Sequence, residues 1–215
     1  MNAVSPHQNQ PVQWAGKPLK EASAVFVLLH GRGASAADIL TLAEELYHPE
    51  VAYVAPQAAG GSWYPYSFLA PIPDNEPGIS SGIEAISTLV DQMTASGLPY
   101  DRLLIGGFSQ GACLALEYVA RNAQRFGGVI GYSGGLIGPD DSSRDYSGSL
   151  DGTPIFLGCS DIDFHIPKER VELTAEVLDK MQGAVTMRLY PGMGHTINQD
   201  ELDQGRSLVA AVAEK

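Results

Sequence analysis

Three serines in this sequence lie in the pattern Gly-x-Ser-x-Gly, which is typical of a serine that acts as a nucleophile. They are Ser80 in GISSG, Ser109 in GFSQG and Ser133 in GYSGG. A serine hydroxyl attacks a carbonyl carbon only when a neighbouring base takes its proton, so a histidine and a carboxylate should accompany it. Because the chain has 24 glycines in 215 residues, the pattern alone is a modest signal, and its surroundings must decide among the three.

Two histidines, His165 and His195, follow Ser109 in the sequence and are the candidate bases. We favour His195, which lies in PGMGH, a glycine-rich loop that can bring an imidazole over the edge of a sheet. The segment SDIDFHIP offers two candidate carboxylates, Asp161 and Asp163, to orient that imidazole. Asp-x-Asp-x-His can also form a metal cluster, but no further matching ligand accompanies it, and we expect no metal site.

The overall composition describes a globular protein and narrows its partners. The hydrophobic content is 44% and the formal net charge is −12, which disfavours binding to nucleic acid or to anionic membranes. The N-terminal segment has no secretory signal pattern, and no apolar run is long enough to cross a membrane. Two cysteines, Cys113 and Cys159, do not make a disulfide framework and are expected to be buried apolar residues. We therefore expect a cytoplasmic protein.

Short apolar runs alternate with amphipathic stretches along the chain, as in an α/β protein. The apolar runs predict strands at 24–30, 51–56, 102–108, 127–133, 153–159 and 185–191. Helices are expected behind capping boxes at Ser35–Asp38 and Ser81–Glu84, after residue 112, after Pro167, and near 200–212. This order predicts a mostly parallel sheet of about six to seven strands with helices on both faces. We expect a single domain at 24–215 behind an N-terminal extension at 1–23.

These elements choose among the three serines. A nucleophilic serine of this kind sits on a sharp turn between a strand and a helix that begins at once behind it. Ser80 follows DNEPG, which cannot be a buried strand, and should lie at a helix start. Ser133 follows a strand but is succeeded by GGLIGPDD, with no helical run. Only Ser109 has a strand ahead and a helix behind, so we predict Ser109 as the nucleophile.

The negative charge that develops on the attacked carbonyl needs two backbone N–H donors. One donor is expected from the residue after the nucleophile, Gln110, and the other from the loop after the first parallel strand. That loop reads HGRG, where glycines allow close backbone approach, and we assign its donor to the N–H of Arg32. Gln110 and Arg32 are thus the predicted oxyanion hole.

Residues 57–80 form an unusually long connection that is too aromatic to be disordered, and such loops are commonly functional. We predict that its side chains wall an apolar acyl or aryl pocket, although they could instead only pack the loop against the domain. The predicted substrate-binding residues are Trp63, Tyr64, Phe68, Leu69 and His165.

The combination of LLHGRG, GGFSQGA, the aspartate pair before Ile-Pro, and PGMGH resembles the phospholipase/carboxylesterase family of α/β hydrolases, which includes acyl-protein thioesterases. The resemblance extends from about residue 24 to the end and implies the α/β-hydrolase fold and a Ser-His-Asp triad. The family's acid loop reads G-x-x-D-P-x-V-P. Counting forward from Gly158 selects Asp161, whereas counting back from Pro167 selects Asp163, and we favour Asp163 because it keeps the spacing into the following helix.

Two departures from the family pattern refine this expectation. Family members often begin with an antiparallel hairpin, and the short segment before the first parallel strand suggests that one strand is missing. The stretch WYPYSFLAP differs from the wording of acyl-protein thioesterases and favours a small carboxylesterase of the bacterial type.

The predicted function is hydrolysis of small to medium acyl or aryl esters through Ser109, His195 and Asp163, without a cofactor. A thioesterase, lysophospholipase or lactone hydrolase is the alternative enzyme, and a non-catalytic relative that binds a small ligand is the alternative of another class. The expected partner is a small-molecule ester, with no nucleic acid and no membrane insertion, and a homodimer is possible.

Overall fold

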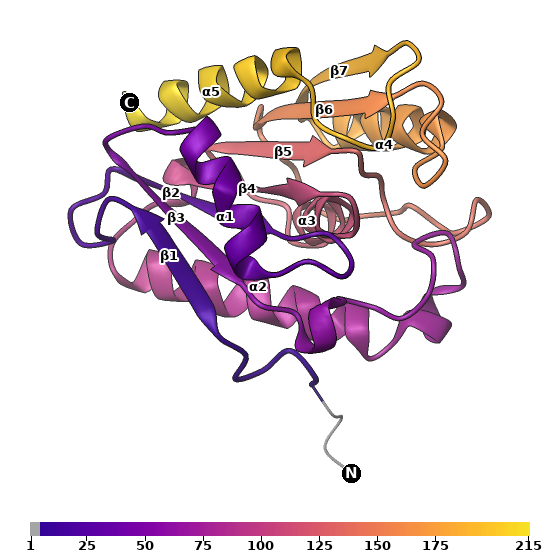
Figure 1. Ribbon diagram of the computed structural model, residues 1–215, viewed down its shortest axis with the longest axis horizontal. Coiled ribbons are helices and arrows are strands. Elements are labelled where there is room, and N and C mark those ends of the chain that lie inside the picture. The colour runs from indigo at the N-terminus through magenta and orange to yellow at the C-terminus, as the bar shows by residue number, and fades with distance from the viewer. Residues whose placement is uncertain (1–4) are drawn as a thin grey trace.

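A seven-stranded sheet with helices on both faces organises the chain (Figure 1). The computed structural model describes residues 5–215. The strands are β1 (Val12–Gly16), β2 (Ala24–Leu29), β3 (Val51–Pro56), β4 (Leu103–Phe108), β5 (Gly128–Tyr132), β6 (Pro154–Ser160) and β7 (Ala184–Tyr190). Their spatial order is β1-β3-β2-β4-β5-β6-β7, and only β1 runs antiparallel to its neighbour. The predicted α/β fold with a mostly parallel sheet is therefore confirmed.

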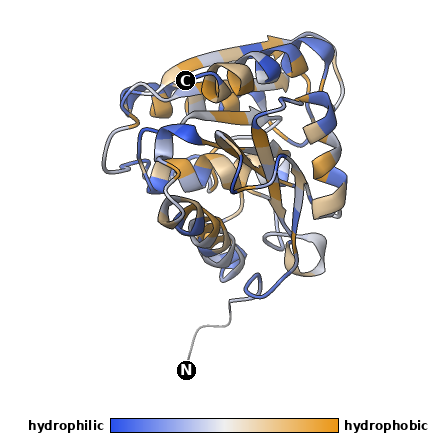
Figure 2. Cartoon of the chain, turned by 90° about the vertical axis from the view of Figure 1, so that its left-hand side faces the viewer, coloured by the Kyte–Doolittle hydropathy of each residue, from blue (hydrophilic) through white to orange (hydrophobic). Residues whose placement is uncertain are grey.

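Five helices cover the two faces of this sheet. They are α1 (Ala36–Glu45), α2 (Gly78–Ala95), α3 (Gln110–Arg121), α4 (Lys168–Lys180) and α5 (Gln199–Ala213). Helices α2, α3 and α4 pack into one apolar core, whereas α1 and α5 pack into the core on the opposite face. Figure 2 shows the apolar residues gathered along the strands and the inward sides of the helices, with the hydrophilic ones turned outward. Burial of this apolar surface is the main stabilising contribution to the fold.

The strand β1 was not among the predicted strands. It lies inside the segment predicted as an N-terminal extension, yet it pairs with β3 from Val12↔Pro56 to Gly16↔Ala52. Its side chains are mostly exposed because it is an edge strand; Trp14, for example, is 45% exposed. A search for continuous apolar runs overlooks such a strand. The predicted boundary at residue 23 therefore does not separate this segment from the sheet, and one antiparallel strand precedes β2.

One predicted helix start is correct and another is wrong. The capping box of Ser35 and Asp38 opens α1 as expected. The helix α2 begins at Gly78, three residues before the predicted cap Ser81. Gly78 lies against the aromatic loop, where a Cβ would come 2.5 Å from the carbonyl oxygen of Trp63. Ser81 instead lies in the first turn, where its hydroxyl accepts the backbone N–H of His7 at 2.9 Å.

Several observations bear on the remaining expectations. Cys113 and Cys159 are both buried free thiols. Within residues 5–215, no helix combines the length and the apolar character that crossing a bilayer would require.

The parallel strands end at one common edge of the sheet, and the loops that follow β2, β4, β6 and β7 carry the predicted site residues to that edge.

Candidate active site

Ser109 occupies a strained turn between the last residue of β4 and the first residue of α3. Its backbone dihedrals are φ 56° and ψ −122°, a conformation that L-residues rarely adopt and that is typical of functional sites. A Cβ on Gly107 would lie 2.4 Å from the carbonyl oxygen of Leu29, and one on Gly111 would lie 2.1 Å from the same oxygen. Glycine is therefore required at both positions, because the end of β4 and the start of α3 lie in backbone contact with the end of β2.

The other two serines of the same pattern have the surroundings that the sequence indicates. Ser80 lies in α2, and its hydroxyl donates to Glu76 at 2.8 Å. Ser133 follows β5 at a turn with φ 49°, is fully buried, and has no helix directly behind it.

A continuous chain of hydrogen bonds joins Ser109 to His195 and His195 to Asp163. The Nε2 atom of His195 lies 2.8 Å from Oγ of Ser109, and its Nδ1 atom lies 2.6 Å from Oδ2 of Asp163. The other oxygen of Asp163 accepts the backbone N–H groups of His165 at 2.8 Å and Ile166 at 3.1 Å. Burial opposes ionisation of Asp163, but these hydrogen bonds hold the pKa of its carboxyl below the ordinary value. An ionised carboxylate in this position favours the tautomer of His195 that carries its proton on Nδ1, with Nε2 as the acceptor that faces Ser109.

Asp161 has a different role from Asp163 in the structure. Its Oδ1 accepts the backbone N–H of Gly192 at 2.8 Å, and its own N–H donates to the carbonyl of Tyr190 at 3.1 Å. Asp161 thus shapes the loop that carries His195 without contacting the imidazole. Among residues 5–215, no group of three or more His, Cys, Asp or Glu side chains is arranged to hold a metal ion.

The loop after β2 comes close enough to the serine to contribute an oxyanion hole. A Cβ on Gly31 would lie 3.5 Å from Cβ of Ser109, so the two backbones are neighbours. Within the described part of the chain, the backbone N–H groups of Arg32 and Gln110 have no protein acceptor. Gln110 is the first residue of α3, where the helix dipole also favours negative charge. The predicted pair of donors is therefore free to bind a developing oxyanion.

The side chains of Arg32 and Gln110 have a second function that the sequence did not reveal. The guanidinium of Arg32 donates to Oγ of Ser62 at 3.0 Å and to the carbonyls of Pro65 at 2.8 Å and Tyr66 at 2.5 Å. It thereby ties the aromatic loop to the oxyanion loop.

The buried amide of Gln110 ties the same loop to the nucleophile turn. Its Oε1 accepts the backbone N–H of Trp63 at 2.9 Å, and its Nε2 donates to the carbonyl of Tyr64 at 2.8 Å. The aromatic loop is thus fastened to both residues whose N–H groups form the candidate oxyanion hole.

A cavity of about 790 Å³ opens beside Ser109. We call residues 64–68 of its lining the loop wall, and Asp38, Ile39, Thr41 and Leu42 of α1 the helix wall. Phe108, Ser109, Gln110, Cys113, His165, Ile166, His195 and Ile197 complete most of the remaining lining. The cavity therefore has aromatic and aliphatic sides that meet at the serine.

Three of the five predicted substrate-binding residues, Tyr64, Phe68 and His165, line this cavity. The prediction was wrong for Trp63 and Leu69, which are not part of the lining. Trp63 is fully buried behind the oxyanion loop, where its indole N–H donates to the carbonyl of His30 at 2.9 Å. Leu69 is partly buried and packs against the apolar core that contains α2, α3 and α4.

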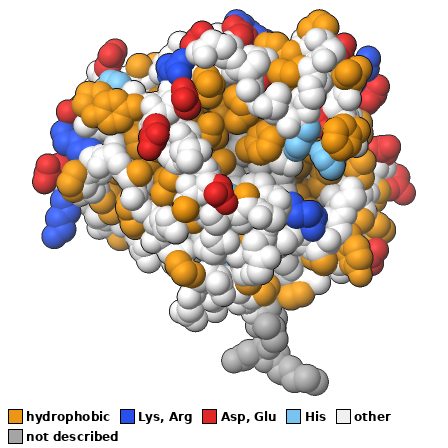
Figure 3. Space-filling view, viewed as in Figure 1, with side chains coloured by type: hydrophobic (Ala, Val, Ile, Leu, Met, Phe, Trp, Pro, Cys, Tyr) orange, Lys and Arg blue, Asp and Glu red, His pale blue; other side chains and the backbone are white. Residues whose placement is uncertain are grey.

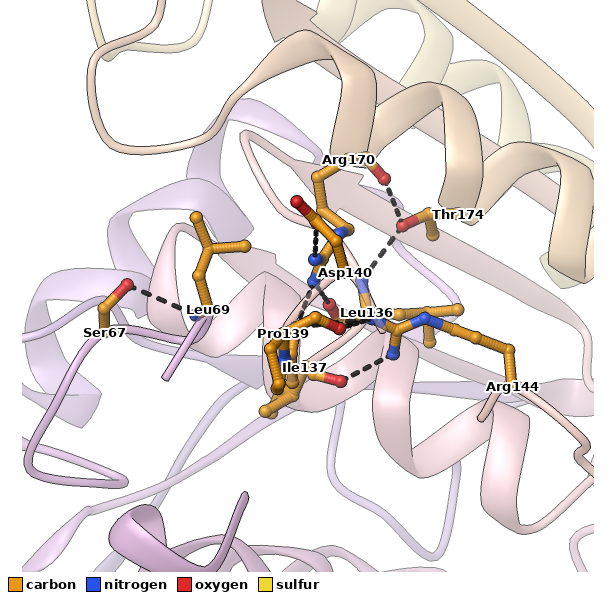
Figure 4. A network of polar contacts seen from close by, with 10 residues as sticks. Ser67, Leu69, Leu136, Ile137, Pro139, Asp140, Arg144, Arg170 and Thr174 are labelled. Carbon is orange, nitrogen blue, oxygen red and sulfur yellow. Dashed lines mark hydrogen bonds and ion pairs between the residues drawn. The ribbon is translucent and has the colours of Figure 1, made fainter. Parts of the chain in front are cut away.

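A buried cation, Arg170, packs against the end of the loop wall, and Figure 4 shows its polar contacts with the segment of Leu136 and Asp140. Arg170 of α4 is 2% exposed, and its guanidinium carbon lies 5.7 Å from the ring centroid of Phe68. It donates to the carbonyls of Leu136 at 2.7 Å and Gly138 at 2.6 Å and pairs with Asp140 at 2.5 Å. The N–H of Gly138 in turn donates to the carbonyl of Phe68 at 2.7 Å. Nothing in the local sequence pattern signals this support.

The mouth of the cavity carries exposed apolar side chains. Tyr66 of the lining is 60% exposed, and Phe164, which is 79% exposed, stacks beside the lining residue His165 with 4.1 Å between the ring centroids. In Figure 3, histidine and apolar side chains meet at the surface toward the right of the view, with a basic side chain beneath them. This mouth suits an apolar molecule that enters from solvent.

Comparisons with known proteins identify the family of this chain. A family model described as Phospholipase/Carboxylesterase matches residues 15–212. The crystal structure of a phospholipase/carboxylesterase from Dyadobacter fermentans is similar, with a TM-score of 0.91 and 40% identity over 97% of this chain and 100% of that one. Acyl-protein thioesterase 1 of Eremothecium gossypii is 28% identical over 94% of this chain and 92% of its own length. The Bacillus cereus carboxylesterase, at 17% identity and a TM-score of 0.74 over 95% of each chain, shares the fold.

Proposed function

The chain belongs to the phospholipase/carboxylesterase family of α/β hydrolases and is an ester-hydrolysing enzyme, and we propose that it is a serine carboxylesterase that works through Ser109, His195 and Asp163. The observation that supports this proposal is the hydrogen-bonded chain from the strained serine through the imidazole to the buried carboxylate. A protein that only bound a small ligand would have no need for this arrangement.

The proposed reaction has two halves that use the same residues. His195 takes the proton of Ser109 through Nε2 as Oγ attacks the acyl carbon, and the oxyanion is held by the N–H groups of Arg32 and Gln110. Each donor contributes about 3–4 kcal/mol to stabilisation of the transition state. His195 then protonates the leaving alcohol, and the acyl group remains on Ser109. In the second half, His195 takes a proton from water, the resulting hydroxide attacks the acyl carbon, and Ser109 leaves with the proton returned by His195.

The cavity supports small to medium acyl or aryl esters as substrates. Its lining is mainly aromatic and aliphatic, and its volume of about 790 Å³ lies within the range of ordinary small-molecule sites. A thioester is the second candidate, because a relative named acyl-protein thioesterase 1 aligns over most of the chain. Cytoplasmic location, a homodimer, and activity on lysophospholipids or lactones stay predictions.

Fluorophosphonate labelling tests the proposed nucleophile. The wild-type protein should be modified at Ser109, and Ser109→Ala should lose both labelling and nearly all esterase activity, roughly 10⁴-fold or more. Ser80→Ala is the matched control, because Ser80 has the same sequence pattern and an exposed hydroxyl but lies in a helix. Absence of labelling at Ser109 in folded wild-type protein would contradict the hydrolase mechanism.

A substrate panel then separates the candidate activities. Nitrophenyl esters of increasing acyl length, one thioester and one lactone should be compared by kcat/KM on the same preparation. The proposal expects the highest value among the esters of short to medium length, and a higher value for the thioester would favour the alternative.

The assignment of the acid is tested by two conservative variants. Asp163→Asn should lower kcat by roughly 10⁴-fold because the imidazole then takes the wrong tautomer. Asp161→Asn should have a much smaller effect, since Asp161 contacts only the loop backbone. A collapse of kcat in Asp161→Asn alone would show that the assignment is wrong.

A further inference from the structure

A short segment between β3 and the loop wall connects the two candidate oxyanion donors. We call residues 58–63 the bridging segment. The carbonyl of Gly61 accepts the N–H of Gly33 at 2.7 Å, next to Arg32 in the oxyanion loop. The backbone N–H of Trp63, at the other end of the segment, donates to the side chain of Gln110 at 2.9 Å. A shift of the bridging segment would therefore displace both donors relative to Ser109.

His7 fastens this bridging segment from behind. It is 5% exposed, although it belongs to the polar N-terminal stretch. Its Nδ1 accepts the backbone N–H of Ala59 at 3.0 Å, and its Nε2 donates to the carbonyl of Trp63 at 2.8 Å. Its own backbone N–H donates to Ser81, which anchors it on α2. Because one ring nitrogen accepts and the other donates, only the neutral imidazole satisfies both partners.

His30 holds the opposite side of the same segment in a similar way. Its Nε2 accepts the backbone N–H of Ala58 at 3.0 Å, and its Nδ1 donates to the carbonyl of Gly31 at 2.8 Å. The indole of Trp63 packs against both imidazoles, with ring centroids 5.2 Å from His7 and 5.1 Å from His30. The bridging segment is thus clamped between two uncharged histidines, one of which comes from the oxyanion loop itself.

We propose that His7 is a positioning residue of the esterase site, whose imidazole fixes the bridging segment and so sets the distance between the oxyanion donors of Arg32 and Gln110. The proposal rests on the proposed function above. His7 contacts neither Ser109 nor the cavity, and it acts through Ala59 and Trp63. Loss of its two hydrogen bonds would leave a buried N–H and a buried carbonyl without partners, which favours displacement of the segment.

The charged groups around His7 do not compensate for protonation of its ring. Glu84 of α2 accepts hydrogen bonds from Ser5 and Gln8 and makes none to the imidazole. His30 faces it across the indole, and Asp38 lies on the side of His30. Burial lowers the pKa of both histidines, so the neutral form predominates at neutral pH.

Steady-state kinetics of three substitutions test the proposal. In His7→Ala, kcat should fall about tenfold while KM changes less than twofold, because the defect lies in stabilisation of the transition state. A trifluoromethyl ketone, whose adduct places an oxyanion in the hole, should bind about tenfold more weakly, whereas the product carboxylic acid should bind equally well. His7→Asn keeps the acceptor for Ala59 and His7→Gln keeps the donor to Trp63, so each should restore part of kcat. His48→Gln, a histidine at the opposite end of β3, is the matched control.

The outcomes separate this inference from the proposed function. If wild-type protein hydrolyses esters and Ser109→Ala does not, but the folded His7 variants match His48→Gln in kcat and in ketone binding, the positioning role is wrong and the esterase assignment stands. Equal losses in kcat and in product binding would also overturn it, since they would indicate general damage to the site. If His7→Ala does not fold, the Asn and Gln variants decide in the same way. A wild-type protein without hydrolase activity would remove the proposed function itself.

Discussion

The two walls of the cavity differ in how they are attached to the reacting centre. The backbone of the loop wall accepts hydrogen bonds from the guanidinium of Arg32 and the amide of Gln110. It is thereby attached to the two residues whose N–H groups are the proposed oxyanion donors. The helix wall is held by the capping box of α1 and by apolar packing, and within residues 5–215 it makes no hydrogen bond to Arg32, Ser109 or Gln110. The cavity thus combines one wall that is hydrogen-bonded to the residues of the proposed oxyanion hole with one that is not.

This difference predicts which kinetic parameter each wall controls. Movement of the loop wall should change kcat, because small displacements of donors weaken stabilisation of the transition state. A change in the helix wall should alter which acyl or alcohol groups fit and so act on kcat/KM among substrates.

Among the tests of the two walls, the largest effect is expected from Gln110→Ala, which removes the hydrogen bonds between the turn of Ser109 and the loop wall. The backbone N–H of Trp63 and the carbonyl of Tyr64 lose buried partners, and we expect kcat to fall roughly 100-fold with a smaller change in KM. Kinetics on a nitrophenyl ester and a thermal melt check this, with the exposed Gln92→Ala as control. An unchanged kcat would show that the loop wall is not coupled to the chemistry.

A smaller effect is expected from Arg32→Met, which keeps the aliphatic part of the side chain and the backbone donor. Loss of three hydrogen bonds to the aromatic loop should lower kcat about tenfold. Arg32→Lys should not restore it, because one ammonium cannot reproduce the fork of the guanidinium. Full activity of the Lys variant would mean that only the positive charge matters, and the geometric attachment would then be refuted.

On the helix wall, Leu42→Trp should leave kcat for an acetyl ester within about twofold and reduce kcat/KM for a long-chain ester about tenfold. The bulky ring fills part of the cavity without touching the oxyanion loop. Glu44→Trp, exposed on the same helix and outside this cavity, is the control. A comparable loss of kcat for both esters would erase the distinction between the walls.

The smallest expected effect concerns stability against pH. Burial lowers the pKa of His7 and His30 behind the loop wall below the usual 6.5, so the unfolded state binds protons first as the pH falls. The stabilisation that these two histidines contribute should therefore begin to fall below about pH 6.5, and the Tm of wild-type protein should then decrease relative to that of His7→Gln. On the helix wall, the hydrogen bonds from Ser35 lower the pKa of Asp38 below 3.8, so its contribution is lost only in stronger acid. Glu201, whose pKa burial raises to about 7, acts equally in both proteins, so a difference in Tm between wild-type protein and His7→Gln that stays constant from pH 7.5 to 5 would contradict the first part.

The sequence predicted what depends on local pattern. The six parallel strands, the turn at Ser109 and the loop of His195 follow from apolar runs, glycines and helix signals that lie next to each other in the chain. The family resemblance drawn from those motifs is confirmed by the match over residues 15–212.

What the sequence did not predict depends on contacts between distant segments. Gln110 contacts Trp63 and Tyr64 across nearly fifty positions, and His7 contacts Trp63 across fifty-six. The sequence of an aromatic loop does not indicate which of its rings faces the cavity. Trp63 was predicted to line the cavity for that reason, but it does not. The support of Phe68 by Arg170 likewise joins two elements whose proximity only the fold creates.

The two glycines that flank Ser109 have a consequence for how such a site can change over generations. Any side chain at position 107 or 111 collides with the backbone of β2, so the nucleophile cannot drift by one residue along the chain. The side chain of Ser109 meets no such collision, and a cysteine at position 109 would present its sulfur in nearly the same place. Evolution can therefore replace the hydroxyl at position 109 by a thiol through one substitution, but it cannot move the attacking group to another position. The same sequence pattern at Ser80 and Ser133 does not provide a second site, because neither serine lies between a strand and a helix that begins at once behind it.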